Sequence, residues 1–323
     1  DVLGFDDEMS TDHNWGPTVL LFLTENNFIL KQDINEMLRN ELPYKFFDYP
    51  VNVRELPDEP GTDVMEPITS GPVNHRVYLT TVSRFIQRHL NFDIAQPLMS
   101  SDWLSFPSQK LRSITGGAVH HDGTGELTEQ RARFNYYPDD IWLYLLACGW
   151  QRIDQEEHLM PRAGYVGDEL GSAIIGSRLV RDIKSLCFLM EKVYPPYPKW
   201  YGSAFRRLEC APTFLPHLWR AQQANDWRQR ESALCEAFQQ LARMHNQIGI
   251  TQQLPEIVSS FHDRPFKVIH GDLFANAIVE QIKDPEIKRI ADKGLIGGID
   301  QFSDSTDLRS NPSWRKSIRT LYT

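Results

Sequence analysis

The chain has 323 residues, of which 41% are hydrophobic, and it carries 43 acidic residues against 34 Lys and Arg. A chain of this length and composition can bury at least one full-sized core, and its length predicts about two domains. The net charge of -9 argues against a protein held on nucleic acid by phosphate neutralisation alone. We therefore expect no nucleic-acid partner.

Cysteine spacing and hydropathy narrow the class of protein further. The four cysteines are far apart and show no CxxC spacing, which indicates neither a zinc site nor a disulfide scaffold. No apolar run reaches the roughly 18 residues that span a bilayer, and no signal-peptide pattern opens the chain. We expect reduced cysteines, no membrane partner and a cytoplasmic location.

Strand and helix patterns alternate over the first eighty residues, which predicts an α/β or α+β unit. The apolar run PTVLLFL follows a Gly-Pro break, as expected for a buried strand. In chain order we expect this strand at 17–23, a helix at 33–40, a second strand within 46–56, a loop over the Pro- and Gly-rich residues 57–72, and a strand at 75–81.

From about residue 81 the pattern becomes helical. We therefore expect a domain boundary there, with an α/β domain at 1–81 and a helical domain at 82–323. Pro138 and the two acids that follow it indicate the start of a helix through 141–158.

Two further helices are expected in the second domain, at 226–246 and within 166–193. The latter is the clearest, because apolar residues recur there at steps of three and four and define one buried face. These residues are Ile175, Leu179, Ile183, Leu186 and Met190.

The motif GFDDEMSTDHNWGP, at residues 4–17, holds the densest chemistry of the chain. Side chains at positions i and i+2 of an extended segment point to the same side, so Asp12 and Asn14 could reach one Mg²⁺ ion. That metal would clamp a triphosphate and stabilise charge as pyrophosphate leaves. Ser10 and His13 are candidates for substrate binding. Alternatively, these short polar residues only form turns and caps before the strand.

Five stretches of the chain together resemble a known family. They are LGFDDEMSTDHNWGP near the start, DIWLYLLACGWQRIDQEE and GDELGSAIIGSRLVRD in the middle, YPPYPKWYGSAF, and GGIDQFSDSTD near the end. Their order over nearly the whole chain resembles the nucleotidyltransferase-like family catalogued as domain of unknown function 4037 (DUF4037). That family is similar in outline to antibiotic nucleotidyltransferases.

The resemblance implies an α+β fold, with a polymerase-beta-type mixed sheet at the N-terminus and a predominantly α-helical domain after it. A Gly-Ser pair that holds phosphate in such proteins would fall just before Asp1, so the first domain is expected to be truncated. Asn14 stands where the paired-acid pattern has a carboxylate, which lowers the expected Mg²⁺ affinity. Asp48 is a candidate for the third metal ligand.

In such transferases a glutamate of the helical domain acts as general base, and the resemblance suggests Glu156 or Glu157 without choosing between them. Arg178 and Arg181 are three residues apart and share a helix face, where they could bind phosphate or carboxylate groups. Arg162 is a third candidate for substrate binding. The alternative is that these arginines pair with nearby acids in a structural network.

Two other motifs have both a functional and a structural interpretation. Lys199 and Trp200, in YPPYPKW, could form a stacking wall for a base or sugar, or the segment could be a corner between helices. His120 and His121 precede Asp122 in a stretch that we expect to form a turn, since adjacent histidines seldom converge on one metal ion.

Residues 270–276, HGDLFAN, with the later Asp300, are similar to the catalytic loop and metal aspartate of aminoglycoside-kinase-like phosphotransferases. The spacing from Asp to Asn is one residue short of that pattern, and no glycine-rich loop precedes it, so this is a minor alternative. The acids of IDQFSDSTD, at residues 299–307, could lie near a nucleotide or cap a helix, and we favour a cap.

The leading hypothesis is Mg²⁺-dependent transfer of a nucleoside monophosphate from a nucleoside triphosphate to a small hydroxyl- or amine-bearing acceptor. The second is a non-catalytic protein that keeps the fold and only binds, which Asn14 favours. The third is a different metabolite-transforming enzyme, because fold alone does not determine the reaction. Its acid or base would come from the helical domain: Glu156, Glu157, His158 or Asp168.

Overall fold

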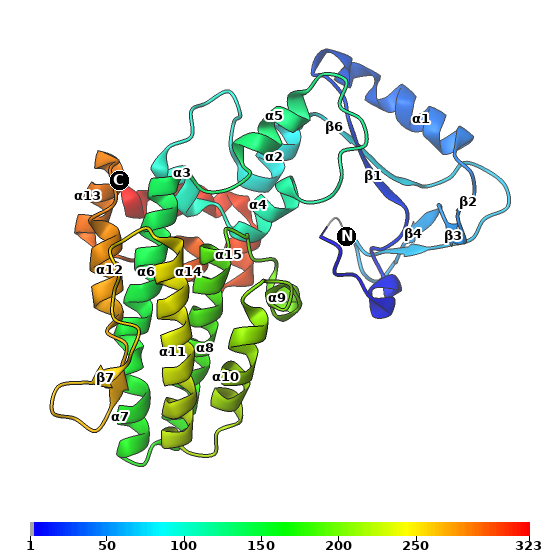
Figure 1. The fold of residues 1–323 in the computed structure, drawn as a ribbon. Helices are drawn as coiled ribbons and strands as arrows, with labels where there is room; N and C mark the ends of the chain where they lie inside the picture. The colour runs from blue at the N-terminus through cyan, green and yellow to red at the C-terminus, as the bar shows by residue number, and fades with distance from the viewer. Residues whose placement is uncertain (1–2) are drawn as a thin grey trace. The chain divides into compact units, whose positions relative to one another are not determined.

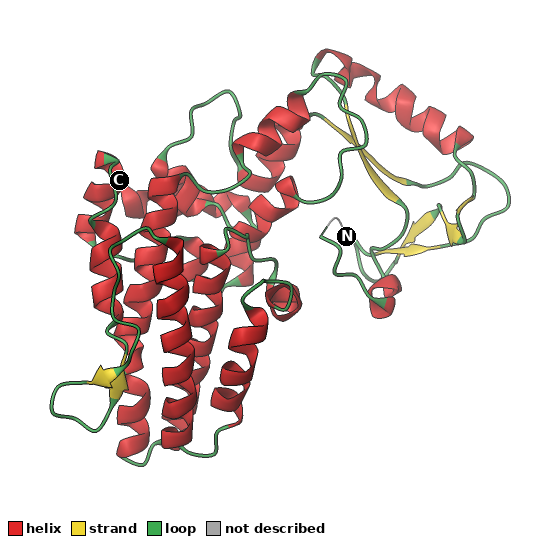
Figure 2. Cartoon of the chain, viewed as in Figure 1, coloured by secondary structure: helices red, strands yellow, loops and turns green. Residues whose placement is uncertain are grey.

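A computed structural model describes residues 3–323, and their contacts divide the chain into two units. The first unit holds the residues up to Gln96 together with Ser113–Arg133. The second, called the helical unit below, holds Pro97–Arg112 together with Phe134–Thr323. Figure 2 shows that most strands belong to the first unit, and that the helical unit has only one short hairpin.

From residue 3 onward, the first unit contains three sheets of two strands each. One is parallel and pairs Leu20 with Tyr78 across its middle, and the other two are short antiparallel pairs. In order of pairing, the strands are β1 (Thr18–Phe22) with β6 (Arg76–Thr80), β2 (Lys45–Phe46) with β3 (Tyr49–Pro50), and β4 (Val53–Glu55) with β5 (Asp63–Met65). The helices are α1 (Lys31–Glu41), α2 (Val82–Leu90) and α5 (Glu126–Arg133), with 3-10 turns at Glu8–Asp12 and Asn26–Leu30.

The structure confirms the outer strands and the first helix of this unit and corrects the rest. The segment 46–56, expected to hold one strand, holds the end of β2 and the whole of β3 and β4, and the expected loop at 57–72 contains β5. The strand expected to be buried is exposed at Val19, Leu20 and Leu21. Among the described residues no sheet has more than two strands, so a nucleotidyltransferase-type mixed sheet is not found.

Proline and glycine explain why the antiparallel strand pairs of the first unit are short. Pro50 lies within β3, where it has no backbone N–H to donate, and Gly61 adopts a φ of +84° in the turn between β4 and β5. A strand interrupted in this way cannot extend a sheet beyond a few residues.

The helical unit is built from long helices and several short ones. The long helices are α6 (Asp139–Glu157), α8 (Glu169–Met190), α10 (Ala211–Gln223) and α11 (Trp227–Ile248). The shorter elements are α3 (Ser100–Ser105), α4 (Ser108–Thr115, which the unit boundary divides), α7 (Leu159–Tyr165), α9 (Pro198–Phe205), α12 (Gly271–Val279), α13 (Pro285–Lys293), α14 (Ile299–Phe302), α15 (Thr306–Ser310), α16 (Arg315–Arg319), and the hairpin of β7 (Ser259–Ser260) with β8 (Lys267–Val268).

Helix α6 is the central helix of this unit. Every residue from 141 to 150 is buried, so the helix is covered on all sides rather than on one stripe. Helices α8 and α12 pack directly against it, and Figure 1 shows them running beside it. Trp150 stacks on Phe274 of α12 with ring centroids 4.1 Å apart.

The apolar stripe expected within 166–193 is confirmed in α8. Four of its five residues are buried, and Ile175 is half-buried. The helix begins at Glu169 because Asp168 caps it, accepting a 2.7 Å hydrogen bond from the backbone N–H of Gly171. Asp226 caps α11 in the same way, so that expected helix is confirmed as well. None of the helices in residues 3–323 is long and apolar enough to cross a bilayer.

Candidate functional site: an aromatic cavity in the helical unit

The helical unit contains a cavity of about 200 Å³, whose walls come from four separate parts of the chain. We call it the aromatic cavity. Its apolar wall is formed by Trp103, Leu104, Phe106, Tyr136, Tyr137, Leu145, Phe188, Leu189, Pro195, Pro196, Pro198, Tyr201, Gly298 and Ile299. Its polar groups belong to Ser108, Arg181, Ser185, Asp300, Gln301, Asp304 and Arg309. Such a combination of apolar walls and a few polar groups is typical of small-molecule sites.

Aromatic rings hold the wall of this cavity in place. Tyr136 and Tyr137 contact each other with centroids 5.1 Å apart, and both contact Tyr194 behind them. On the other wall Phe188 of α8 contacts Tyr201 of α9 at 5.2 Å. Burial raises the pKa of Tyr137 and of Tyr201 well above the ordinary phenol value. Both hydroxyl groups are therefore neutral at physiological pH and can donate a hydrogen bond.

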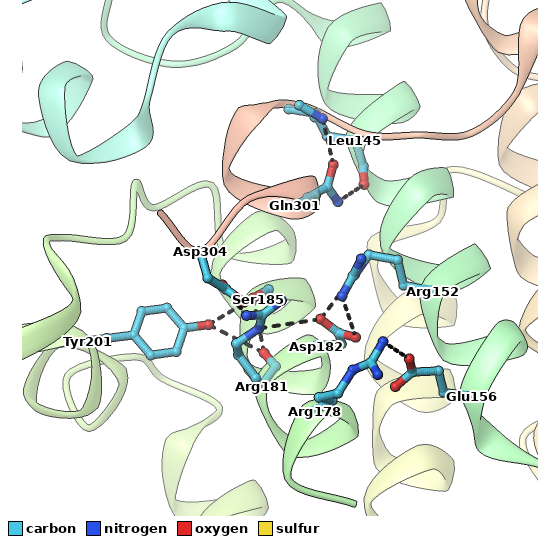
Figure 3. Close-up of polar contacts among 11 residues, drawn as sticks. Leu145, Arg152, Glu156, Arg178, Arg181, Asp182, Ser185, Tyr201, Gln301 and Asp304 are labelled. Carbon is cyan, nitrogen blue, oxygen red and sulfur yellow. Dashed lines mark hydrogen bonds and ion pairs between the residues drawn. The ribbon is translucent and has the colours of Figure 1, made fainter. Parts of the chain in front are cut away.

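A hydrogen-bond network connects Tyr201 to helix α8 (Figure 3). The Tyr201 and Ser185 hydroxyl groups lie 2.9 Å apart, and Ser185 donates to the backbone carbonyl of Arg181 at 3.0 Å. The Tyr201 hydroxyl also lies 3.4 Å from that carbonyl. These contacts fix the orientation of the tyrosine ring at the cavity wall.

Arg181 is the cation of α8 that faces the cavity. Its guanidinium forms an ion pair with Asp304, from the segment after α14, and lies 3.8 Å from Asp182 (Figure 3). Asp182 is only 4% exposed and accepts two hydrogen bonds from Arg152 of α6, at 3.2 and 3.3 Å. The hydrogen bond from Arg181 lowers the pKa of Asp304 below its ordinary value.

A second ion pair lines the cavity at the end of the chain. Asp300 of α14 accepts a 2.7 Å hydrogen bond from the backbone N–H of Ser108, at the start of α4, and lies 3.6 Å from Arg309. Asp300 therefore binds the first backbone N–H of α4 rather than a terminal helix, and the cap of α15 is Ser305. Gln301 donates to the backbone carbonyl of Leu145 at 2.9 Å and so attaches α14 to α6.

Glu156 and Glu157, the two candidates for a general base, have different surroundings. Glu156 pairs with Arg178 on α8, and its Oε2 atom is buried without a hydrogen-bond partner among the described residues (Figure 3). Burial raises the pKa of Glu156, and the charge of Arg178 opposes this. The pairing of Arg178 is the one expected from a structural network.

Glu157 binds backbone rather than side chains. Its Oε2 atom accepts from the N–H of Ile269 at 2.5 Å, and its Oε1 atom accepts from the N–H of Gly271 at 3.1 Å. These bonds hold the turn in which His270 has a φ of +61°, between β8 and α12. Desolvation raises the pKa of Glu157 to about 8, against the two N–H groups that lower it. Glu157 therefore has a structural role at this turn.

The opening motif does not have the expected extended geometry. Asp12 ends a 3-10 turn and lies 2.8 Å from His13, while Asn14 has a φ of +51°. The Oδ1 atom of Asn14 accepts a 3.0 Å hydrogen bond from the backbone N–H of Asp63, so this oxygen is already engaged. Ser10 forms a capping box with Asp7. Asp12 and Asn14 therefore do not belong to one continuous extended segment, which the i and i+2 argument assumed, and a shared Mg²⁺ site stays a prediction.

No group of three or more His, Cys, Asp and Glu side chains within residues 3–323 is arranged to hold a metal ion. Asp48, the candidate third ligand, follows Phe47 in the turn between β2 and β3 and is exposed.

The other candidate residues lie on different parts of the helical unit. Arg162, on α7, is exposed and forms no ion pair within the described chain. Lys199 lies over the ring of its neighbour Trp200 at 4.7 Å. The proline-rich segment before it lines the aromatic cavity through Pro195, Pro196 and Pro198, so it is a wall as well as a corner.

The two remaining motifs have structural roles. Asp122 accepts hydrogen bonds from the backbone N–H groups of Gly125 and Thr128, which confirms a turn before α5. HGDLFAN leads into helix α12, where Asp272 and Asn276 lie on the helix rather than in a catalytic loop. The kinase-like interpretation is therefore not favoured by the local geometry.

Sequence reasoning missed Tyr136, Tyr137 and Ser185 as cavity residues. The tyrosine pair directly before Pro138 was a usable signal, since adjacent aromatic residues at a helix start often pack or bind. Ser185 gave none, because a serine within an apolar helix has many structural explanations.

The structure is thus that of a mainly helical protein with a partly aromatic cavity in its helical unit. Residues 103–201 match the family model described as Domain of unknown function (DUF4037). The matched family is the one that the sequence motifs suggested. The matched segment includes the cavity wall from Trp103 to Tyr201, whereas the wall from Gly298 to Arg309 lies outside it. No curated protein and no solved structure matches the chain.

Proposed function

We propose that this protein binds a small organic molecule in the aromatic cavity of its helical unit. The observation that carries the proposal is the cavity itself, where rings and prolines surround a few fixed hydrogen-bonding groups. Tyr201 and Ser185 are held by their own network, and Arg181 presents a charge at the same wall. Such a site binds an apolar body by burial and orients it through its polar end.

Filling the cavity is expected to abolish this binding. In Ser185→Phe the added ring would occupy space on the cavity wall, so binding of small aromatic fragments should weaken by about 10-fold or more. Ligand-observed NMR with a collection of anionic, neutral and cationic fragments measures this. Ser177→Phe is the matched control, because Ser177 is exposed on the same helix and does not line the cavity. Equal binding by both variants would place the ligand elsewhere.

Nucleotidyl transfer is a second proposal. The exposed carboxylate of Asp12, in the first unit, supports it, since transfer needs a metal ligand. The engaged amide of Asn14 favours the alternative, a protein that binds without chemistry. Because Asp12 and Asn14 are not on one extended segment, no catalytic step is assigned to them.

Pyrophosphate release separates these two possibilities. Asn14→Asp keeps an oxygen acceptor for the N–H of Asp63 and adds a charge, so it should raise Mg²⁺-dependent release from ATP, GTP, CTP or UTP by about 10-fold. Asp12→Ala should abolish the release. Calorimetry of each nucleotide with and without Mg²⁺ measures binding independently. If neither the natural chain nor Asn14→Asp releases pyrophosphate or binds any nucleotide, transfer is excluded and cavity binding is unaffected.

A further inference from the structure

We propose that the ligand of the aromatic cavity is a small organic anion with an aromatic or apolar body, whose carboxylate binds Arg181 in place of Asp304. This inference rests on the proposed function, because it requires that the cavity binds a small molecule. Beyond that function, the inference specifies the charge of the ligand and the residue that the ligand displaces.

The first step is the charge balance around Arg181. Two acids lie near its guanidinium, Asp182 and Asp304. Asp182 lies closer to Arg152 than to Arg181, and Arg152 donates two hydrogen bonds to it. Arg152 therefore neutralises Asp182, and Asp304 is left to balance the charge of Arg181.

The second step is the exposure of Asp304. Its side chain is 74% exposed, whereas that of Arg181 is 35% exposed and that of Asp182 is 5% exposed. An exposed acid in an ion pair is already largely solvated, so its release into water costs little. A ligand carboxylate that replaces Asp304 would keep the charge around Arg181 unchanged. It could also bind the guanidinium through two parallel hydrogen bonds.

The third step concerns the other cation of the cavity, Arg309. Its Nε atom is buried and has no hydrogen-bond partner among the described residues, and its nearest acid, Asp300, lies 3.6 Å away. Asp300 directs its other oxygen to the backbone N–H of Ser108. Arg309 therefore keeps an unused donor beside the cavity, while Asp300 and Asp304 are both engaged.

A cationic ligand would meet the opposite situation. It would face the guanidinium groups of Arg181 and Arg309, and it would have to compete with them for Asp304 and Asp300. Repulsion between the charge of the ligand and these two guanidinium groups would disfavour binding. The body of the ligand is set by the walls, where the rings of Tyr136, Tyr137, Phe188 and Tyr201 provide flat apolar surfaces.

The test compares three probes of nearly equal shape, benzoate, benzamide and benzylammonium, by calorimetry on the full chain. Benzoate should bind most tightly and benzylammonium least. Arg181→Gln should weaken benzoate by about 10-fold or more, because it removes the charge-assisted pair. Arg220→Gln, which removes a surface arginine paired with Glu236 on α10 and α11, should leave the affinity unchanged.

Asp304→Asn gives a readout of opposite sign, which loss of folding cannot imitate. Removal of the competing carboxylate should raise benzoate affinity by about 2- to 5-fold, the range that corresponds to one exposed ion pair. Asp307→Asn, an exposed acid of α15 outside the cavity lining, is its control. Neither change should affect benzamide.

The outcomes separate this inference from the proposal beneath it. Three outcomes would contradict an anionic ligand and still leave a cavity that binds small molecules. They are equal affinity for all three probes, preference for benzylammonium, and weaker benzoate binding by Asp304→Asn. If no probe binds and the fragment collection also fails against the natural chain, both proposals fall together.

Discussion

Replacing Gly164 with alanine is expected to lower the free energy of unfolding by about 3 kcal/mol or more, the largest effect that we expect from a single methyl group. A Cβ atom at Gly164, in α7, would lie 2.1 Å from Cβ and 2.3 Å from Cγ of Trp227. These atoms are next to the backbone of α11 and cannot rotate away. Trp227 is also buried and packed against Phe266. The two helices would therefore have to separate.

Gly202→Ala is the matched control for this prediction. Gly202 lies in α9, and a Cβ atom there would meet nothing within 4 Å. Alanine in a helix is more favourable than glycine by about 0.5–1 kcal/mol, so this variant should be slightly more stable. Urea unfolding followed by tryptophan fluorescence measures both variants. A Gly164→Ala variant as stable as the natural chain would mean that α7 and α11 are not in close contact.

Removing the Glu157 side chain is expected to cost about 2–5 kcal/mol of stability. Glu157→Ala would leave the buried N–H groups of Ile269 and Gly271 without acceptors, and each unpaired group costs about 1–3 kcal/mol. Glu280→Ala, an exposed glutamate just after α12, should change stability by no more than about 0.5 kcal/mol. Similar effects of the two variants would contradict the assigned role of Glu157.

The same residue predicts a pH dependence. The pKa of Glu157 is about 8 in the folded chain and 4.5 ordinarily, so between these values the folded state binds the proton more strongly than the unfolded state. The contribution of this group is fully present below pH 4.5 and is lost as pH rises through 8. The stability of the natural chain relative to Glu157→Gln should therefore fall over this window. A constant difference would show that the two backbone N–H groups fully offset desolvation.

The long helices could be predicted from the sequence because their signals are local. The apolar stripe of α8 and the capping residues Asp168 and Asp226 lie within the segments that they specify. The first unit could not be predicted as well. Whether an apolar run such as PTVLLFL becomes buried depends on the segments that pack over it, and no local pattern reports this.

The cavity could be predicted only in fragments. The sequence identified Arg181 and the acids near Asp300 as candidate charged residues. Their pairing could not be predicted, because it joins α8 to the C-terminal part of the chain. The Arg181–Asp304 pair spans 123 residues, and Gln301 reaches Leu145 across 156 residues. Contacts over such separations follow from tertiary packing, and one sequence alone does not contain them.

The burial of α6 on all sides has a consequence for synthesis of the chain on the ribosome. Helix α12, which covers α6, directly follows the turn that Glu157 holds. The contact between Glu157, at the end of α6, and Ile269, in that turn, spans 112 residues. At about 5–20 residues per second, α6 would leave the ribosome on the order of ten seconds before that cover is made. During this time the apolar faces of α6 lack part of their cover, so we expect α8 and α11, or a chaperone, to shield it until the C-terminal part is made.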